Sequence, residues 1–174
     1  MPMPVPPTGA PLRADALADR TLLWAAPASD RAQMPHWTQR LTGYGAHLVP
    51  LTDETSASAA ADLLLADLRL AAADAEPAAV VTAGFLAARQ ALPALTTGQG
   101  AVLFLLPPPD AGKDSADGAA LVTATVSLAR SLAQEWADRQ IRVNSVIDAG
   151  TGDRLADLIG YLSSPAAVML TGQQ

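Results

Sequence analysis

The sequence predicts an α/β fold: a reduced, Rossmann-like, doubly wound parallel sheet with helices on both faces. Short apolar runs alternate along the chain with longer amphipathic segments, which is the pattern of repeated strand–helix units. The run from Ala101 to Leu106 is continuously apolar, as expected for a strand that helices cover on both faces. We expect five parallel strands, centred near Leu22, Leu48, Val80, Leu103 and Val143.

The composition fits one globular domain and narrows the classes of partner. The chain has 174 residues, of which 50% are hydrophobic, and a formal net charge of −6. This charge argues against nucleic acids and anionic membrane surfaces as partners. Cysteine is absent, which excludes disulfides, a thiol nucleophile and a thiolate metal site. No apolar run reaches membrane-spanning length, and we expect a cytoplasmic protein.

Residues 1–14 form a proline-rich segment ahead of a single domain that we place at residues 15–174. The segment has no basic stretch followed by an apolar one, so it does not resemble a secretory signal. Its prolines favour an extended, disordered arm, and a partner-binding arm is the alternative.

The first strand and its turn determine whether a dinucleotide could bind. Thr21 to Ala26 is the predicted strand, and the turn after it, Pro27 to Pro35, contains no glycine. A nucleotide-binding turn needs glycine so that the backbone can approach the phosphates. Its prolines remove backbone donors, and Asp30 would repel a phosphate. The sequence therefore predicts no cofactor site at this turn.

A helix at Trp37 to Leu41 and a strand at Ala46 to Leu51 follow. Asp53 then stands roughly where a dinucleotide fold places its ribose-binding acid, although without the glycine turn we favour a loop or helix-capping role. His36 and His47 lack the spacing of metal ligands, so we expect no metal site.

The middle of the chain predicts a helix, a strand and a second helix. Ser58 to Ala73 is rich in alanine and leucine and is interpreted as helical. Ala78 to Gly84 is interpreted as a buried strand, and Phe85 to Leu95 as the next helix.

The stretch from Asp117 to Ile147 predicts a long helix followed by a strand at Ile141 to Ile147. The helix carries two apolar stripes, and one stripe is enough to cover a sheet. We expect the second stripe either to contact another subunit or to lie within the core of this domain. The stripe expected on the sheet is Leu121, Thr125, Leu128 and Leu132, and the second is Val122, Val126, Ala129 and Ala133. Another helix is predicted at Arg154 to Leu162.

Three segments, in the correct order, resemble the short-chain dehydrogenase/reductase (SDR) family, in particular its 3-oxoacyl-carrier-protein reductase branch. LARSLAQEWADRQIRVNSV is similar to a helix and the strand after it. GFLAARQALPALTTGQGAVLFL resembles the preceding helix and strand, and YLSSPAAVMLTGQ the late helix with its TGQ turn. The resemblance covers the C-terminal half well and the N-terminal half by pattern alone. It implies an NAD- or NADP-dependent oxidoreductase fold.

The chemistry of the resembled family is missing from the matched positions. The catalytic serine falls on Leu105 or Leu106, and the tyrosine and lysine of the YxxxK pair fall on Gly118 and Val122. The family's TGxxxGxG turn has no counterpart, and its asparagine positions fall on Val81 and Thr82. The substrate lid is absent, and the sequence ends at Gln174, where the family continues into a last strand. A substitute constellation of Lys113, Asp114 and Ser115 is a weak alternative.

The resemblance therefore implies a degenerate, truncated member that keeps its assembly helices and has lost its catalytic groups. We expect a non-catalytic subunit, a pseudoenzyme without a cofactor of its own, that forms a hetero-oligomer with an active SDR paralogue carrying NAD or NADP. A homo-oligomer is also compatible with this reading. The alternatives are an active reductase with relocated residues, or a self-associating ligand-binding or regulatory module. The residues expected at the subunit interface are Phe85, Arg89, Leu92, Val122, Val126, Ala129, Ala133 and Trp136.

Overall fold

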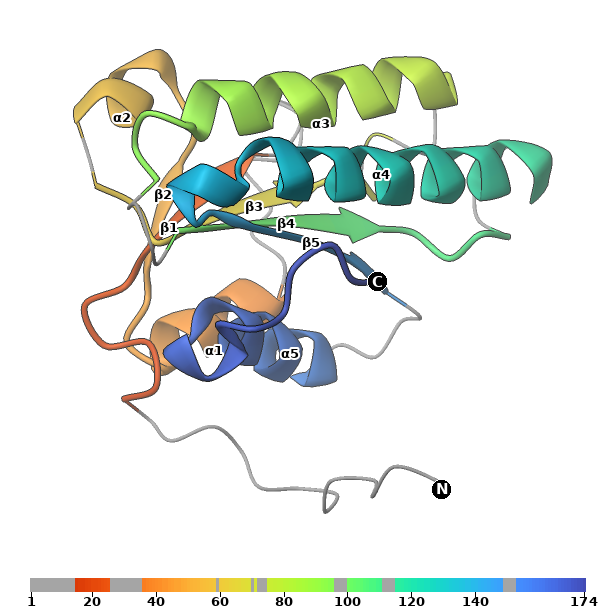
Figure 1. The fold of residues 1–174 in the computed structure, drawn as a ribbon. Coiled ribbons are helices and arrows are strands. Elements are labelled where there is room, and N and C mark those ends of the chain that lie inside the picture. Colours follow the sequence, from red (N-terminus) through yellow and green to blue (C-terminus); the bar gives the residue numbers. More distant parts are fainter. Residues whose placement is uncertain are drawn as a thin grey trace, which may run out of the picture.

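The computed structural model describes residues 15–25, 36–58, 60–69, 71, 75–95, 100–110, 115–148 and 153–174. Five parallel strands form one sheet in the order β2-β1-β3-β4-β5 (Figure 1). This arrangement confirms the predicted doubly wound parallel fold. The strands are β1 (Thr21–Ala25), β2 (His47–Pro50), β3 (Leu63–Asp67), β4 (Ala101–Leu106) and β5 (Arg142–Ile147).

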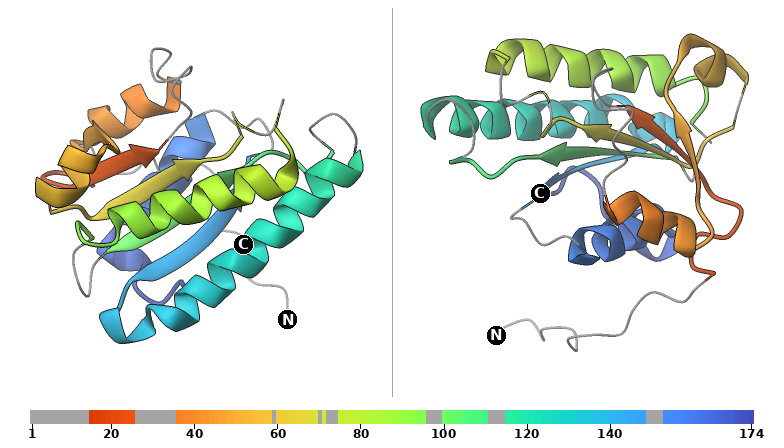
Figure 2. Two further views of the ribbon diagram at one scale, coloured as in Figure 1. Left: turned by 90° about the horizontal axis from the view of Figure 1, so that it is seen from above. Right: turned by 180° about the vertical axis from the view of Figure 1, so that it is seen from behind.

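Helices cover both faces of the sheet. The helices are α1 (His36–Gly43), α2 (Asp53–Ser58), α3 (Pro77–Ala91), α4 (Ser115–Glu135) and α5 (Asp153–Ser163). Figure 2 shows α3 and α4 lying side by side on one face, whereas α1 and α5 pack together on the other. Two short 3₁₀ helices, Ala137–Arg139 and Pro165–Ala167, follow α4 and α5.

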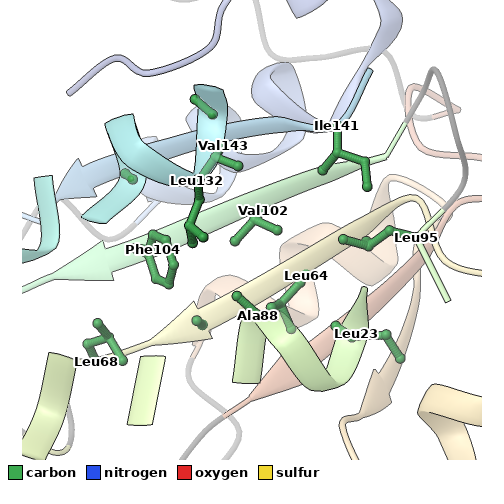
Figure 3. Packing of buried hydrophobic residues seen from close by; sticks show 14 of the residues in the cluster. Leu23, Leu64, Leu68, Ala88, Leu95, Val102, Phe104, Leu132, Ile141 and Val143 are labelled. Atoms are coloured by element: carbon green, nitrogen blue, oxygen red, sulfur yellow. The ribbon is translucent and has the colours of Figure 1, made fainter. Parts of the chain in front are cut away.

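The central strands divide the interior into two cores because alternate side chains point to opposite faces. Leu64 and Ala66 of β3 belong to the core beneath α3 and α4, whereas Leu63 and Leu65 belong to the core against α1 and α5. Figure 3 shows Phe104 of β4 in the first core together with Leu64, Val102 and Leu132. Burial on both faces explains why β3 and β4 read as continuous apolar runs.

The prediction for the middle of the chain was wrong in two places. The segment expected to be a helix from Ser58 to Ala73 contains β3, and the segment expected to be a strand from Ala78 to Gly84 lies in α3. Alanine and leucine have high helix propensity, but all five residues of β3 are buried, and this packing overrides the propensity. Pro77 lies in the first turn of α3, a position where its missing N–H costs nothing.

Gly84 lets α3 lie close to the sheet. A Cβ atom at this position would stand 3.1 Å from Leu68 and 3.4 Å from Phe104. The small apolar residues from Ala78 to Gly84 therefore reflect the close packing of a helix on the sheet, not a buried strand.

The other predicted elements are confirmed, with shifts of a few residues at their ends. They comprise the strands at β1, β2, β4 and β5 and the helices at α1, α4 and α5. The proline-rich arm and the turn from Pro27 to Pro35 lie outside the described residues. Within the described part of the chain, no helix combines the length and apolar character needed to cross a membrane.

The C-terminal segment follows the outer edge of β5. The Gly172 amide donates to the Val143 carbonyl (2.7 Å), and the Ser145 amide donates to the Gln173 carbonyl (3.0 Å). Asn144 strengthens the contact because its side chain donates to the Leu170 carbonyl and accepts from the Gln173 amide. These bonds satisfy backbone groups that an edge strand would otherwise expose.

Candidate functional site

The carboxyl ends of the five strands meet at one edge of the sheet. The strand order changes direction between β1 and β3, because β2 lies on one side of β1 and the later strands lie on the other. Open α/β sheets bind ligands in the crevice at such a switch point. The candidate site is therefore the carboxyl edge around β1, β3 and β4.

A guanidinium held by two carboxylates dominates this edge. Arg69, just after β3, donates from Nε to Asp67 Oδ1 (2.8 Å) and from Nη2 to Asp67 Oδ2 (2.6 Å). Its Nη1 donates to Asp148, which follows β5. The Asp67 side chain is fully buried, and those of Arg69 and Asp148 are 17% and 14% exposed. A charge pair with so little exposure is stabilising only if its members are also well hydrogen-bonded. Here both oxygens of Asp67 and three nitrogens of Arg69 take part in hydrogen bonds.

This ion-pair network, Asp67–Arg69–Asp148, spans the end of β4. The Leu68 amide donates to the Leu105 carbonyl (3.0 Å), and the Asp148 amide donates to the Leu106 carbonyl (2.9 Å). Arg69 thus links a residue beside one flank of β4 to a residue beside the other. Burial lowers the pKa of Arg69, but the bonds to Asp67 and Asp148 outweigh it and raise the pKa above its ordinary value. The guanidinium therefore stays charged and remains committed to its partners.

Two tryptophans of the core against α1 and α5 lie beside the network. The Arg69 guanidinium stands 5.8 Å from the ring centroid of Trp37, a residue of α1. Trp37 meets Trp24 of β1 edge to face, with centroids 6.4 Å apart. This cation–π contact contributes further stabilisation.

The positions that the resemblance assigned to catalysis hold no reacting group. Leu105 and Leu106 are fully buried in β4, and Val122 of α4 is 8% exposed and lies in the core beneath α4. Gly118 is also buried. Val81 and Thr82, the expected asparagine positions, lie on α3 rather than at a strand end, so that assignment was wrong. Lys113 and Asp114 lie outside the described residues, as does the side chain of Ser115.

Asp53 lies at the start of α2, just after β2. Gln90 of α3 donates to Asp53 Oδ1 (2.9 Å). The residue that caps α2 is Thr52, whose hydroxyl accepts from the Thr55 amide (3.1 Å) while Thr55 Oγ1 accepts from the Thr52 amide (2.8 Å). This reciprocal pair is equivalent to a capping box.

A crevice with a volume of about 500 Å³ opens at the switch point, between the sheet and α3. Its floor is formed by the ends of β1 and β3, including Ala25, Ala66 and Leu68, and one wall by Val80, Ala83 and Leu86 of α3. The volume falls within the range of small-molecule sites.

The described residues that line the crevice do not supply the groups that bind the pyrophosphate of a nicotinamide dinucleotide. None of the described residues that line the crevice carries a positive charge, and the carboxylate there, Asp67, is held by Arg69. A pyrophosphate needs converging backbone or cationic donors, and the strand ends supply aliphatic side chains instead. Among the described residues, no group of three or more histidine and acidic side chains could hold a metal ion.

The residues expected at a subunit interface fall into two groups. Val122, Val126, Ala129, Ala133 and Trp136 are at most 9% exposed and belong to the core beneath α3 and α4. Of the two alternatives for the second stripe, the structure shows burial within the core of this domain, beneath α3 and against the sheet, and not a contact with another subunit. On α3, Arg89 is exposed with its guanidinium 5.7 Å from the Phe85 ring centroid, and Phe85 and Leu92 are half-buried.

Sequence reasoning missed the ion-pair network. The assignment of Ser58 to Ala73 to a helix concealed the strand end at which Asp67 and Arg69 lie. The signal was the polar pair in Ala66-Asp67-Leu68-Arg69, which interrupts the run of leucines just where a parallel strand would end.

The comparisons agree with this architecture. No family model and no curated protein matches the sequence. Solved structures do match, among them a variant short-chain dehydrogenase/reductase of Serratia marcescens, with 16% identity over 91% of this chain and 95% of that chain and a TM-score of 0.66. The citronellol catabolism dehydrogenase of Pseudomonas aeruginosa has 15% identity over 92% of this chain and 94% of that chain, with a TM-score of 0.68.

An enoyl-(acyl-carrier-protein) reductase of Anaplasma phagocytophilum, solved with NAD, has 14% identity over 94% of this chain and 92% of that chain, with a TM-score of 0.67. At these identities the likeness concerns the backbone. The chain therefore has the fold of the short-chain dehydrogenases/reductases.

Proposed function

We propose that this chain is a non-catalytic subunit that assembles with an active SDR, whose substrates would be 3-oxoacyl or 3-hydroxyacyl thioesters. The observation that carries the proposal is the carboxyl edge of the sheet. Where the catalytic serine of the resembled family would stand, Leu105 and Leu106 are buried, and the neighbouring guanidinium of Arg69 is bound by two carboxylates. NAD or NADP would be held by the partner subunit.

The described groups at this edge cannot carry out a carbonyl reduction. Such a reaction needs a proton donor beside the carbonyl and a bound source of hydride. Gly118 and Val122 have no ionisable group, and Arg69 holds its proton firmly because its pKa is raised. The edge therefore supports a structural role for the chain.

The outward face of α3 and α4 supports an assembly role. An exposed helix usually carries many charged side chains, and few are present here. On α3, Leu86 is 54% exposed and Arg89 is the exposed charged residue of the helix. On α4, the exposed small residues are Ala116, Ala119, Ala120, Thr123, Ala124, Ser127 and Ser131.

A flat surface depleted of charge allows two helix pairs to approach closely. The interface we propose is therefore this outward face, defined by Leu86 and Arg89 of α3 and by Thr123, Ala124 and Ser127 of α4. It replaces the buried stripe as the contact surface, and it keeps Arg89 from the expected interface, with the half-buried Phe85 and Leu92 at its border.

Co-expression with full-length SDR paralogues from the same genome tests the proposal. We expect light scattering to show a mixed oligomer with one of them, and Ala124→Arg to remove this chain from it. The matched control is Leu158→Arg, on the opposite face of the sheet, where Leu158 is 41% exposed. That variant should assemble normally.

Two results would argue against the proposed function, and a third would move the interface. A monodisperse monomer that ignores every paralogue would end the proposal. A homo-oligomer that Ala124→Arg dissociates, without any heteromer, would favour the self-associating module. A heteromer that tolerates Ala124→Arg would keep the function but place the interface elsewhere.

A further inference from the structure

We propose that the switch-point crevice binds an uncharged aliphatic chain. The crevice borders the proposed interface at Leu86, but binding there does not require the chain to assemble. The crevice lies where an open α/β sheet binds ligands, and its volume of about 500 Å³ is sufficient for a small molecule.

The lining determines the chemistry of the ligand. Most of the described lining residues are alanines, joined by Leu51, Leu68, Val80 and Leu86. None of them is aromatic, so a planar base would find no ring to stack against. An alkyl chain needs neither stacking nor hydrogen bonds, and it gains by leaving water.

The polar lining residues are already bound within the protein. Asp67 accepts two hydrogen bonds from the Arg69 guanidinium and one from the Arg69 amide, and the Gln90 side-chain amide donates to Asp53. A charged ligand would therefore lose its hydration without gaining a counter-charge. This argument selects against phosphates and carboxylates and favours a neutral chain.

The rim of the crevice supports binding rather than simple packing. Leu86 is 54% exposed although it borders the crevice, and Ala83 beside it is also exposed. Seven alanines line the cavity, and their short side chains leave space that larger residues would fill. A bound chain would cover Leu86 and occupy that space.

The test is an NMR titration of the isolated, isotope-labelled chain with 1-octanol, and separately with adenosine monophosphate. We expect octanol to shift the amides of Leu68, Val80 and Leu86 saturably, with a Kd on the order of 1 mM, given the few atoms of the probe. Adenosine monophosphate should not shift these amides.

Ala83→Phe should fill the crevice and weaken octanol binding at least tenfold. Ala78→Phe is the matched control, since Ala78 is exposed on the same helix but does not line the crevice, and it should bind like the wild type. Leu86→Asp, which places a charge at the rim, provides a second variant should Ala83→Phe unfold.

The absence of saturable shifts in the wild type would overturn the proposal. So would equal octanol binding by Ala83→Phe and Leu86→Asp, or binding of adenosine monophosphate at the same amides. None of these outcomes depends on whether the chain assembles with a partner.

Discussion

The interior of the sheet and its carboxyl edge are stabilised by different interactions. In the interior, leucine, valine and alanine side chains from all five strands and their helices fill two cores. At the edge, an arginine and two aspartates, Asp67–Arg69–Asp148, join the ends of β3 and β5 across β4. The stability of the interior depends on how well side-chain volume fills it, whereas the stability of the edge depends on the pairing of charges.

Under the proposed non-catalytic role, this difference explains how the fold can persist without the family's catalytic groups. Cores tolerate many apolar substitutions if the volume is preserved, so a backbone can persist at 14–16% identity. A catalytic edge needs particular groups at particular atoms. Here the chain's own side chains occupy that edge and satisfy one another.

The largest expected effect concerns the interior. Phe104→Ala removes a fully buried ring, and we expect a loss of about 3–5 kcal/mol in the free energy of unfolding. Urea denaturation measures it, with Leu158→Ala as the exposed control that should change stability by less than about 1 kcal/mol. A loss below about 1 kcal/mol for Phe104→Ala would show that the core is not packed as described.

The next effect concerns the edge. Arg69→Met leaves Asp67 buried without its partner, which should cost about 2–3 kcal/mol, less than for a wholly buried pair because Arg69 is 17% exposed. The double variant Arg69→Met/Asp67→Asn removes the stranded charge and should recover about half of that loss. If the double variant is less stable than the single one, the network does not act through charge pairing.

A smaller effect concerns the contact between α1 and α5. The Tyr44 hydroxyl donates to Asp157 Oδ1 (2.5 Å) and accepts from Arg40 Nε (3.0 Å). Tyr44→Phe should cost about 1 kcal/mol, because the side chains of Arg40 and Asp157 are about one third exposed and can bind water instead. A loss above about 3 kcal/mol in urea denaturation would mean that the phenol is essential to this face.

The smallest effect is a pH dependence of the same contact. Burial, aided by the bond to Asp157, raises the pKa of Tyr44 above its ordinary value of 10.0. The neutral phenol is therefore favoured by folding, so its contribution is complete below pH 10.0 and is lost as the pH rises through the raised value. The free energy of unfolding should fall more steeply for the wild type than for Tyr44→Phe once the pH rises above about 10. Parallel curves would contradict this assignment.

Much of the fold could be predicted from the sequence because periodicity reports burial directly. The long α4 helix followed by β5, and the continuous apolar run of β4, were read correctly. The sequence predicted a helix where β3 lies and a strand where α3 begins. This error arose because alanine and leucine suit both a helix and a strand that is buried on both faces. Only the tertiary packing, with Gly84 against Leu68 and Phe104, distinguishes them.

For the candidate site, the sequence predicted only which catalytic and cofactor-binding groups are missing. The resemblance located positions that carry leucine, glycine and valine, and the structure shows where they lie. It could not reveal the Asp67–Arg69–Asp148 network, since Asp148 is 79 residues from Arg69 and the two meet only when β3 and β5 flank β4. Burial of Val122 and Ala129 likewise depended on α3, a neighbour whose position the sequence did not define.

The most direct test of the account is a fluorescence titration of the purified chain with NADH and NADPH at millimolar concentrations. An intact SDR paralogue serves as the positive control, and the Gly118→Tyr/Val122→Lys variant is titrated alongside. We expect neither the wild type nor the double variant to bind either cofactor saturably, and we expect no oxidation of cofactor, because Arg69 at this edge is already bound to Asp67 and Asp148 and the described crevice lining carries no positive charge. Saturable binding by the wild type would contradict the account and favour an active reductase with relocated residues.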